Sequence, residues 1–342
     1  MSQPTATAME LETPIAPYVD TRRRSHRALG VAGKYGTIIG LALMIVILSI
    51  AAPGTFLSVD NFVNVITQNS LIAIVACGMT LPLVVGEFDL SLGYVASFAG
   101  VLSVGLMSHQ GVPMGLAIVL AVLIGAVAGI VNGLLVTQLR VNALIATLGT
   151  GTVVVGLNYA YTNGVPVNLL PESSGFVNLA LGKIAGIPNP VIVMVVVVIV
   201  LWLVLNRTVL GQQMQAVGGN RDAAELSGVR VERVRIWAFV IAGLCAALAG
   251  MMLASRVGSG QLTAGDGYLM NSFAAVFLGS AALRDGEFHI LGTVIGVALV
   301  GFGFNGLAIL GAPTFFQYIF SGGLLIVAVA LSTVARRYAR GS

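Results

Sequence analysis

The sequence consists largely of long apolar stretches that are separated by short polar links. A stretch of about 20 apolar residues is long enough to cross the hydrocarbon core of a bilayer as an α-helix. Charged side chains make up only 9% of the chain, against about 25% in a typical soluble domain. A soluble fold of this size could not cover so much apolar surface. The sequence therefore predicts an all-α, polytopic bundle of about ten transmembrane helices.

Two of the links between the apolar stretches are distinctive. Residues 86–89 interrupt the chain between the second and third stretch, and residues 162–189 are the longest expected external segment. The link before residue 70 is polar because it contains Asp60, Asn61 and Asn64. The ten expected spans are residues 35–52, 70–85, 90–107, 113–136, 143–161, 190–205, 236–255, 268–283, 290–309 and 315–334.

The remaining polar segments divide the chain into one domain and two tails. Residues 1–34 lack the apolar core of a signal peptide, which predicts a flexible cytoplasmic tail. Residues 35–335 form the expected transmembrane domain, which includes a polar loop at 207–235. Residues 336–342 are expected to form a second cytoplasmic tail.

The distribution of basic residues predicts the orientation of the spans. With ten spans and an internal N-terminus, all but Lys183 and Arg256 of the 17 lysines and arginines lie on one side. Basic residues concentrate in cytoplasmic loops of membrane proteins, so both termini and the 207–235 loop are expected in the cytoplasm. The net charge of +4 follows from this topology and does not indicate a nucleic-acid partner.

The 207–235 loop contains a short segment with helix-terminating residues at both ends. Asn220 is a favourable N-cap, and Gly228 is a favourable residue just past a helix C-terminus. The residues between them predict a helix of about two turns. Such a helix, presented between two spans, is suited to docking a partner, and a solvated connector is the alternative interpretation.

The sequence offers no constellation for catalysis or for a cofactor. The nearest approach to a phosphate-binding loop is Gly30–Tyr35, where Tyr35 replaces the required Ser or Thr. The three histidines and two cysteines show no metal-ligand spacing, and Cys77 and Cys245 each lie inside an apolar run. Asp266 has no second aspartate within a span, which argues against an intramembrane protease. We expect no catalytic residue, no metal and no cofactor in this chain.

Uncharged polar residues are the main candidates for a translocation pathway. Asparagine is costly in hydrocarbon and tends to face a bundle interior or a pathway, and a neutral hydroxylated solute would suit such a lining. The alternative is hydrogen bonding between helices. A proton-coupled secondary transporter would need more buried charge. The candidate pathway residues are Asn69, Asn132, Asn158, Asn271 and Asn305, and the candidate hinge or gate residues are Glu87, Asp89 and Gly93.

One short segment recurs later in the chain. The sequence GEFDLSLG at residues 86–93 is echoed by GEFHILG at residues 286–292. Repeated halves are common in transporters, where the pathway lies at the repeat interface. A chance match of two short segments is the alternative.

Several motifs together resemble the permeases of monosaccharide ABC importers, the ribose, xylose and arabinose group. They cover roughly residues 60–330. Residues 87–93 (EFDLSLG) are similar to the family signature GGIDLSVG, and residues 142–149 (NALIATLG) to the family's PFIxTLG. The later segments GGN…AAELSG (218–228), AAVFLG (274–279) and GTVIG (292–296) follow in the family's order. Glu87 in place of the usual Gly, and Asn142-Ala143 in place of Pro-Phe, depart from the family pattern.

The resemblance implies a permease of the bacterial inner membrane that pairs with itself or with a paralogue. It also implies an extracytoplasmic sugar-binding protein and a separate ATP-binding cassette subunit, which would bind ATP and Mg. A stand-alone secondary transporter and a branched-chain amino-acid permease are the alternatives. The coupling helix that would dock on the ATPase comprises Asn220, Arg221, Asp222, Ala223, Ala224, Glu225, Leu226, Ser227 and Gly228.

Overall fold

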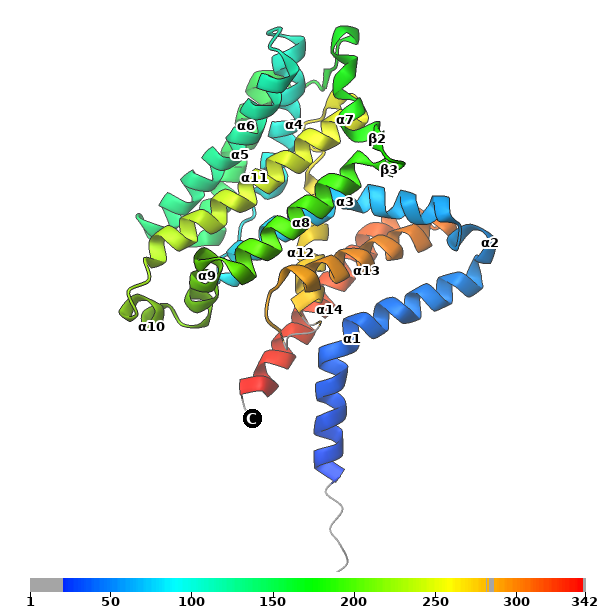
Figure 1. Cartoon of the computed structure of the whole chain (residues 1–342), viewed down its shortest axis with the longest axis vertical. Helices are drawn as coiled ribbons and strands as arrows, with labels where there is room; N and C mark the ends of the chain where they lie inside the picture. The colour runs from blue at the N-terminus through cyan, green and yellow to red at the C-terminus, as the bar shows by residue number, and fades with distance from the viewer. Residues whose placement is uncertain (1–20, 281, 283–285, 341–342) are drawn as a thin grey trace, which may run out of the picture.

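The chain is described by a computed structural model that covers residues 21–280, 282 and 286–340. Helices dominate these residues, which confirms the all-α prediction (Figure 1). The helices are α1 (Thr21–Ala51), α2 (Pro53–Phe56), α3 (Val59–Val84), α4 (Leu92–Ser108), α5 (Met114–Thr137), α6 (Ala143–Thr162), α7 (Asn178–Leu181), α8 (Asn189–Arg207), α9 (Val209–Gly219), α10 (Arg221–Leu226), α11 (Val231–Val257), α12 (Asp266–Ser280), α13 (Ile290–Ile309) and α14 (Phe315–Arg340). A 3-10 turn, η1, covers Pro171–Phe176, and the strands are β1 (Val167–Asn168), β2 (Lys183–Ile184), β3 (Ile187–Pro188) and β4 (Ser259–Gly260).

Six of the described helices are long and apolar enough to cross a membrane: α3, α5, α6, α8, α11 and α13. Shorter apolar helical stretches cover Gly36–Ala51, Leu92–Ser108 and Phe315–Val327. The expected eighth span coincides with α12, which has only 15 residues. The count of ten spans therefore stays a prediction.

The helix boundaries differ from the predicted ones in the polar segments. The expected polar link before residue 70 is helical, because α3 begins at Val59. The Ser58 side chain accepts a hydrogen bond from the Asn61 backbone N–H at 3.2 Å, and Asp60 lies in the first turn. A capping Ser and an early acidic residue both stabilise a helix N-terminus.

The two predicted tails also contain helix. Residues 21–34 belong to α1, which continues into the first apolar stretch, and residues 336–340 belong to α14. Residues 21–34 are therefore helical where the sequence predicts a flexible tail, and residues 1–20 and 341–342 lie outside the described part.

The links between the helices gather at two ends of the molecule. The α3–α4 break, the α5–α6 link and the segment from α10 to the start of α11 line one cleft, and we call this side the cleft end. The α6–η1 link and the residues after α11 meet at the other side, where β1 pairs antiparallel with β4. We call it the hairpin end, because the β2–β3 hairpin lies near the same side (Figure 1).

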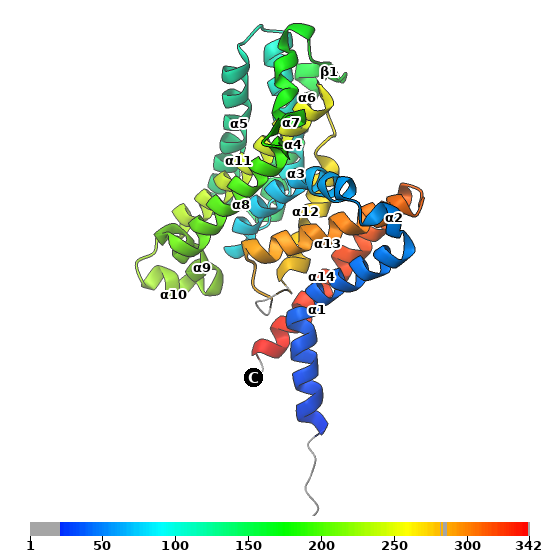
Figure 2. The same ribbon diagram turned by 45° about the vertical axis from the view of Figure 1, so that its right-hand side comes forward.

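Helix α11 is the central element of the bundle. In its most apolar window 72% of the residues are buried, against 28% for α5 and 17% for α8. Close backbone contact with α5 is possible because Gly125 and Gly243 face each other, and a Cβ at either would overlap the other's carbonyl. Small residues allow such approach between membrane helices. Helices α12, α13 and α14 pack together beside this group (Figure 2).

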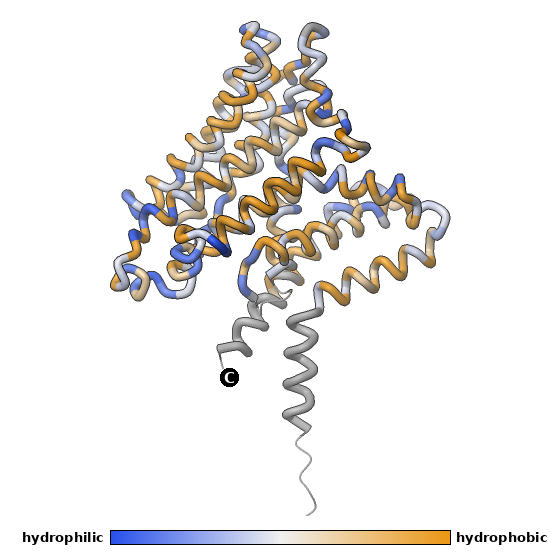
Figure 3. Tube along the Cα trace, viewed as in Figure 1, coloured by the Kyte–Doolittle hydropathy of each residue, from blue (hydrophilic) through white to orange (hydrophobic). Residues whose placement is uncertain are grey.

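The outer helices present apolar side chains to the surroundings. The tube of α8 is almost uniformly hydrophobic (Figure 3). Its exposed large side chains include Val195, Val196 and Ile199. An apolar helix with so little buried surface requires lipid around it.

Candidate functional site

The cleft at the cleft end has a volume of about 980 Å³ and is lined by nine charged residues. Segments that are far apart in the sequence form its walls. The charged residues that line it are Glu87, Arg140, Arg221, Asp222, Glu225, Arg230, Glu232, Arg233 and Arg235.

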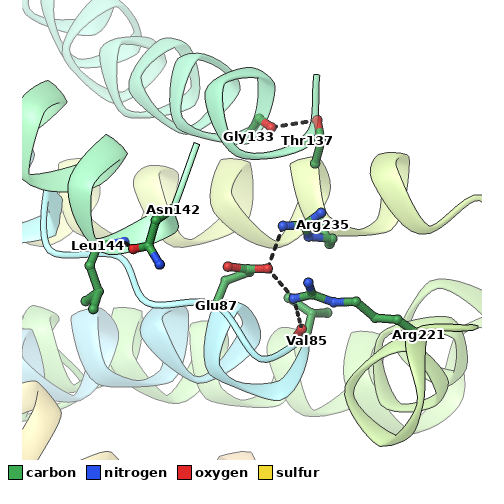
Figure 4. A network of polar contacts seen from close by, with 8 residues as sticks. All are labelled: Val85, Glu87, Gly133, Thr137, Asn142, Leu144, Arg221 and Arg235. Carbon is green, nitrogen blue, oxygen red and sulfur yellow. Dashed lines mark hydrogen bonds and ion pairs between the residues drawn. The ribbon is translucent and has the colours of Figure 1, made fainter. Parts of the chain in front are cut away.

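Glu87 forms the centre of the polar network in this cleft (Figure 4). Its side chain is only 8% exposed and lies in the break between α3 and α4. Arg235 of α11 donates to Glu87 Oε1 at 2.6 Å, and Arg221 of α10 pairs with the same oxygen. Arg221 also donates to the Val85 carbonyl at 3.4 Å. One buried carboxylate thus connects the α3–α4 break to both α10 and α11.

The sequence explains why α10 is placed beside Glu87. The Asn220 side chain accepts from the Ala223 N–H at 3.0 Å, and Gly228 has φ +84. These observations confirm the two predicted helix caps. Ala224 packs inward at 4% exposure, whereas Leu226 is 91% exposed. One side of α10 therefore packs against the bundle, and the other side exposes Leu226.

Sequence reasoning misses the helix that precedes α10. The sequence predicts a loop with one short helix at 207–235, but this segment also contains the 11-residue α9. Thr208 caps α9 by accepting from the Gly211 N–H at 3.2 Å. At its other end, Gly218 packs directly against the Val84 carbonyl, where a Cβ would overlap the oxygen. Helix α9 thus contacts the last residue of α3, three positions before Glu87.

Asp89 organises a second cluster just after Glu87. Its Oδ1 accepts from the Ser91 backbone N–H at 2.9 Å and from Ser91 Oγ at 2.6 Å. Asn132 of α5 donates to Ser91 Oγ at 2.9 Å. Burial raises the pKa of Asp89 to about 6, and the hydrogen bonds from Ser91 and Asn132 oppose the shift. These contacts fix the start of α4 against α5.

Gly93, the third candidate hinge residue, contacts the segment before α12 and not the cluster around Asp89. It sits in the first turn of α4, and a Cβ there would lie 2.8 Å from the Gly265 carbonyl. Close approach of α4 to the residues before α12 requires glycine at this position. The hinge or gate role of Glu87, Asp89 and Gly93 stays a prediction.

The candidate pathway asparagines Asn69, Asn158 and Asn271 each make a side-chain hydrogen bond within the bundle. Asn158 donates to the Leu262 carbonyl at 3.2 Å, and Asn271 accepts from Ser321 at 2.8 Å. Asn69 donates to the Val65 carbonyl at 2.8 Å, one turn back in its own helix. Their role in a pathway stays a prediction. The contacts of Asn158 and Asn271 match the alternative, which is hydrogen bonding between packed segments.

Asn305 has a partner that sequence reasoning misses. Its side chain and that of Asn61 exchange two hydrogen bonds, of 3.1 and 2.8 Å, between α13 and α3. The sequence pattern assigns Asn61 to a polar link, and for this reason it does not predict a hydrogen bond between Asn61 and Asn305. A helix start at Val59, which Ser58 and Asp60 indicate, would locate Asn61 on a span.

The two echoed segments, residues 86–93 and 286–292, both contact α12. Gly86 and Gly286 both have positive φ, of 81° and 92°. The rings of Phe88 and Phe288 both contact Phe277 of α12, with centroid distances of 6.4 and 5.3 Å. His289, for which the sequence predicts a loop position, is buried and caps α13 by accepting from the Gly292 N–H at 2.9 Å. The segments that lead into α4 and α13 thus both contact the same residue of α12.

The sequence matches one family model and several transport permeases. Residues 61–329 match the family described as "Branched-chain amino acid transport system / permease component". The chain is 41% identical to the ribose import permease protein RbsC of Bacillus subtilis (strain 168), over 88% of this chain and 93% of that protein. It is 33% identical to the D-allose transport system permease protein AlsC of Escherichia coli (strain K12), over 87% and 91%. It is 34% identical to the L-arabinose ABC transporter permease protein AraH of Azospirillum brasilense, over 99% and 97%.

Proposed function

The chain belongs to the branched-chain amino acid transport system / permease component family, and we propose that it is the permease subunit of an ATP-driven importer for a monosaccharide. The proposed substrate class rests on one observation, which is the solutes that the similar proteins are named for. The family description names amino acids, but the relatives at 33–41% identity are permeases for ribose, allose and arabinose. A branched-chain amino acid is the alternative substrate, favoured by the family description alone.

Energy for transport would come from a separate ATP-binding cassette subunit that binds ATP and Mg. An extracytoplasmic sugar-binding protein would deliver the solute, and a second copy of this chain or a paralogue would complete the permease. The concentration of arginines at the cleft end supports a cytoplasmic position for that end. In that orientation the β2–β3 hairpin is extracytoplasmic.

We assign the coupling role to α10 at the cleft end. Leu226 is 91% exposed although it is a large apolar side chain, which suits docking of the helix into an apolar groove of a partner. Arg221 of the same helix reaches the buried Glu87. A push on α10 by the ATPase would therefore act on the α3–α4 break through an ion pair, and on the end of α3 through the packed Gly218.

Uptake by the complete importer tests the substrate class. Cells that express this chain with its neighbouring ATPase and binding protein should accumulate one of labelled ribose, arabinose or allose and should not accumulate leucine. Accumulation of leucine without any sugar would overturn the proposal in favour of the amino-acid alternative. Uptake by the single chain in liposomes, driven by an ion gradient without ATP, would identify a secondary transporter instead.

A paired substitution tests the coupling role. Glu225→Ala with Leu226→Ala should leave the unfolding midpoint unchanged and abolish uptake, because Leu226 makes few contacts within this chain. Leu310→Ala is the matched control, since this leucine is 58% exposed and follows α13 at the opposite end. Normal uptake by the double variant would remove α10 from the coupling path.

A further inference from the structure

The β2–β3 hairpin is an exposed feature of the hairpin end that the coupling function does not use. β2 pairs antiparallel with β3. Ala185 and Gly186 form the turn with φ of 51° and 82°, and two residues at positive φ are typical of a type I′ hairpin turn. The Asn189 N–H donates to the Gly182 carbonyl at 3.0 Å and closes the base. The hairpin is therefore a defined structure with a fixed shape.

The two faces of the hairpin differ in chemistry. Its register places Ile184 opposite Ile187 and Lys183 opposite Pro188. Neighbouring residues on a strand point to opposite faces, so both isoleucines share one face and Lys183 lies on the other. Ile184 is 63% exposed and Ile187 is 49% exposed. The isoleucine face is apolar and uncovered within the described chain.

Hydrogen bonds fix the hairpin to the bundle near the end of α11 and the start of α8. The short helix α7 precedes it, and the hydroxyl of Ser255 on α11 joins α7 to the bundle. Ser255 Oγ donates to the Phe176 carbonyl at 2.6 Å and accepts from the Ala180 N–H at 3.1 Å. The Asn189 side chain donates to the Asn178 carbonyl at 3.0 Å and links the start of α8 to α7.

An α8 that crosses the membrane would place the hairpin at the boundary of the hydrocarbon core. Helix α8 begins at Asn189, directly after β3, and has 19 residues. At about 1.5 Å per residue its length is close to the roughly 30 Å of a bilayer core. In its most apolar window only 17% of the residues are buried, so its outer face contacts lipid. The hairpin projects sideways from the bundle beside this end of α8 (Figure 1).

We propose that the β2–β3 hairpin is an anchor that lies in the membrane interface. Ile184 and Ile187 enter the boundary between headgroups and acyl chains, and Lys183 faces the water and the lipid phosphates. Amphipathic helices that lie in the membrane interface combine an apolar and a cationic face in the same way. Lipid is favoured over a protein partner because β3 leads directly into α8, an apolar helix of which little is buried. The inference rests on α8 crossing the membrane and does not depend on which solute is transported.

Fluorescence with brominated lipids tests this placement. Trp202 and Trp237 are the two tryptophans of the chain, and phenylalanine replaces both in the background variant. Ile184→Trp is then compared with Val165→Trp, because Val165 is equally exposed at 62% and lies between α6 and β1 at the same end. Each full-length protein is reconstituted into phosphatidylcholine nanodiscs with bromine near the headgroup or near the acyl-chain end.

The proposal predicts that Ile184→Trp loses most of its emission with shallow bromines and less with deep bromines, while Val165→Trp keeps its emission. Ile187→Trp, on the same face, should repeat the result and guards against a single misfolded variant. Equal losses at Val165 and Ile184 would overturn the proposal. Blue-shifted emission of Ile184→Trp without quenching would also overturn it, because a protein surface, either a second copy or a binding protein, would then cover the hairpin.

Discussion

Replacement of Glu87 by glutamine removes the charge that both Arg221 and Arg235 face, while the side-chain volume is retained. Glu87 and Arg235 have side-chain exposures of 8% and 13%, so their pair is largely shielded from water. Leaving a buried arginine without its partner costs about 2–3 kcal/mol. The Arg221 side chain is 44% exposed, and solvent screening limits its share to below about 1 kcal/mol. We expect Glu87→Gln to reduce the free energy of unfolding by about 3 kcal/mol.

A double-mutant cycle measures the Glu87–Arg235 and Glu87–Arg221 ion pairs separately. Unfolding is followed by tryptophan fluorescence in mixed micelles of increasing SDS content, for Glu87→Gln, Arg221→Gln, Arg235→Gln and the two pairs. The coupling energy should be about 2 kcal/mol for Glu87 with Arg235 and below about 1 kcal/mol for Glu87 with Arg221. Glu232→Gln is the matched control, because Glu232 lines the same cleft and is exposed.

Two results would refute this reasoning. One is an unfolding free energy of Glu87→Gln within about 0.5 kcal/mol of the parent protein, the range of ordinary surface changes. The other is a stronger coupling to Arg221 than to Arg235. In transport assays, Arg221→Gln should fold normally yet use more ATP for each solute imported, since α10 would lose its ion pair to the α3–α4 break.

Single contacts lead to three further predictions. Gly218→Ala should reduce uptake and the unfolding midpoint, because its Cβ would overlap the last carbonyl of α3, whereas Gly219→Ala, with open space around it, should change neither. The Asp89 carboxyl, which lies between α3 and α4, has its pKa raised to about 6 from 3.8, so the folded state binds a proton more readily than the unfolded state. Its contribution to stability should therefore rise by about 3 kcal/mol as the pH falls from 7 to below 4, and Asp89→Asn should remove this dependence in SDS unfolding measured across that range. Asn305→Leu should lower the free energy of unfolding by about 1–2 kcal/mol by leaving the amide of Asn61 without its partner, and an unchanged midpoint with reduced sugar flux would assign Asn305 to the pathway instead.

The sequence predicts the local structure where short-range chemistry decides it. The caps at Asn220 and Gly228 can be recognised because an N-cap acceptor and a residue at positive φ are properties of single positions. The break after Val84 is likewise visible as a polar interruption of an apolar run. Helix α9 is missed, because its mixed composition resembles a loop and its burial depends on contacts with α3 and α8.

The partners of the five candidate pathway asparagines could not be predicted from the sequence. Their cost in hydrocarbon predicts that each needs a partner, and this is what the structure provides for Asn132, Asn158, Asn271 and Asn305. Which partner each finds depends on how the helices are rotated about their axes. Most of these helices carry apolar side chains on every side, so their sequences do not specify which face turns toward the bundle interior.

By itself, the sequence determined that this chain is a helical membrane protein with a capped helix in a polar loop, because span length and helix caps are set by neighbouring residues. Only the tertiary structure decided that Glu87 meets Arg221 and Arg235, which follow it by 134 and 148 residues. The physical reason lies in helix packing. Glycine contacts such as that of Gly218 with α3 set how closely the helices approach, and that approach determines which charges at the helix ends are buried together.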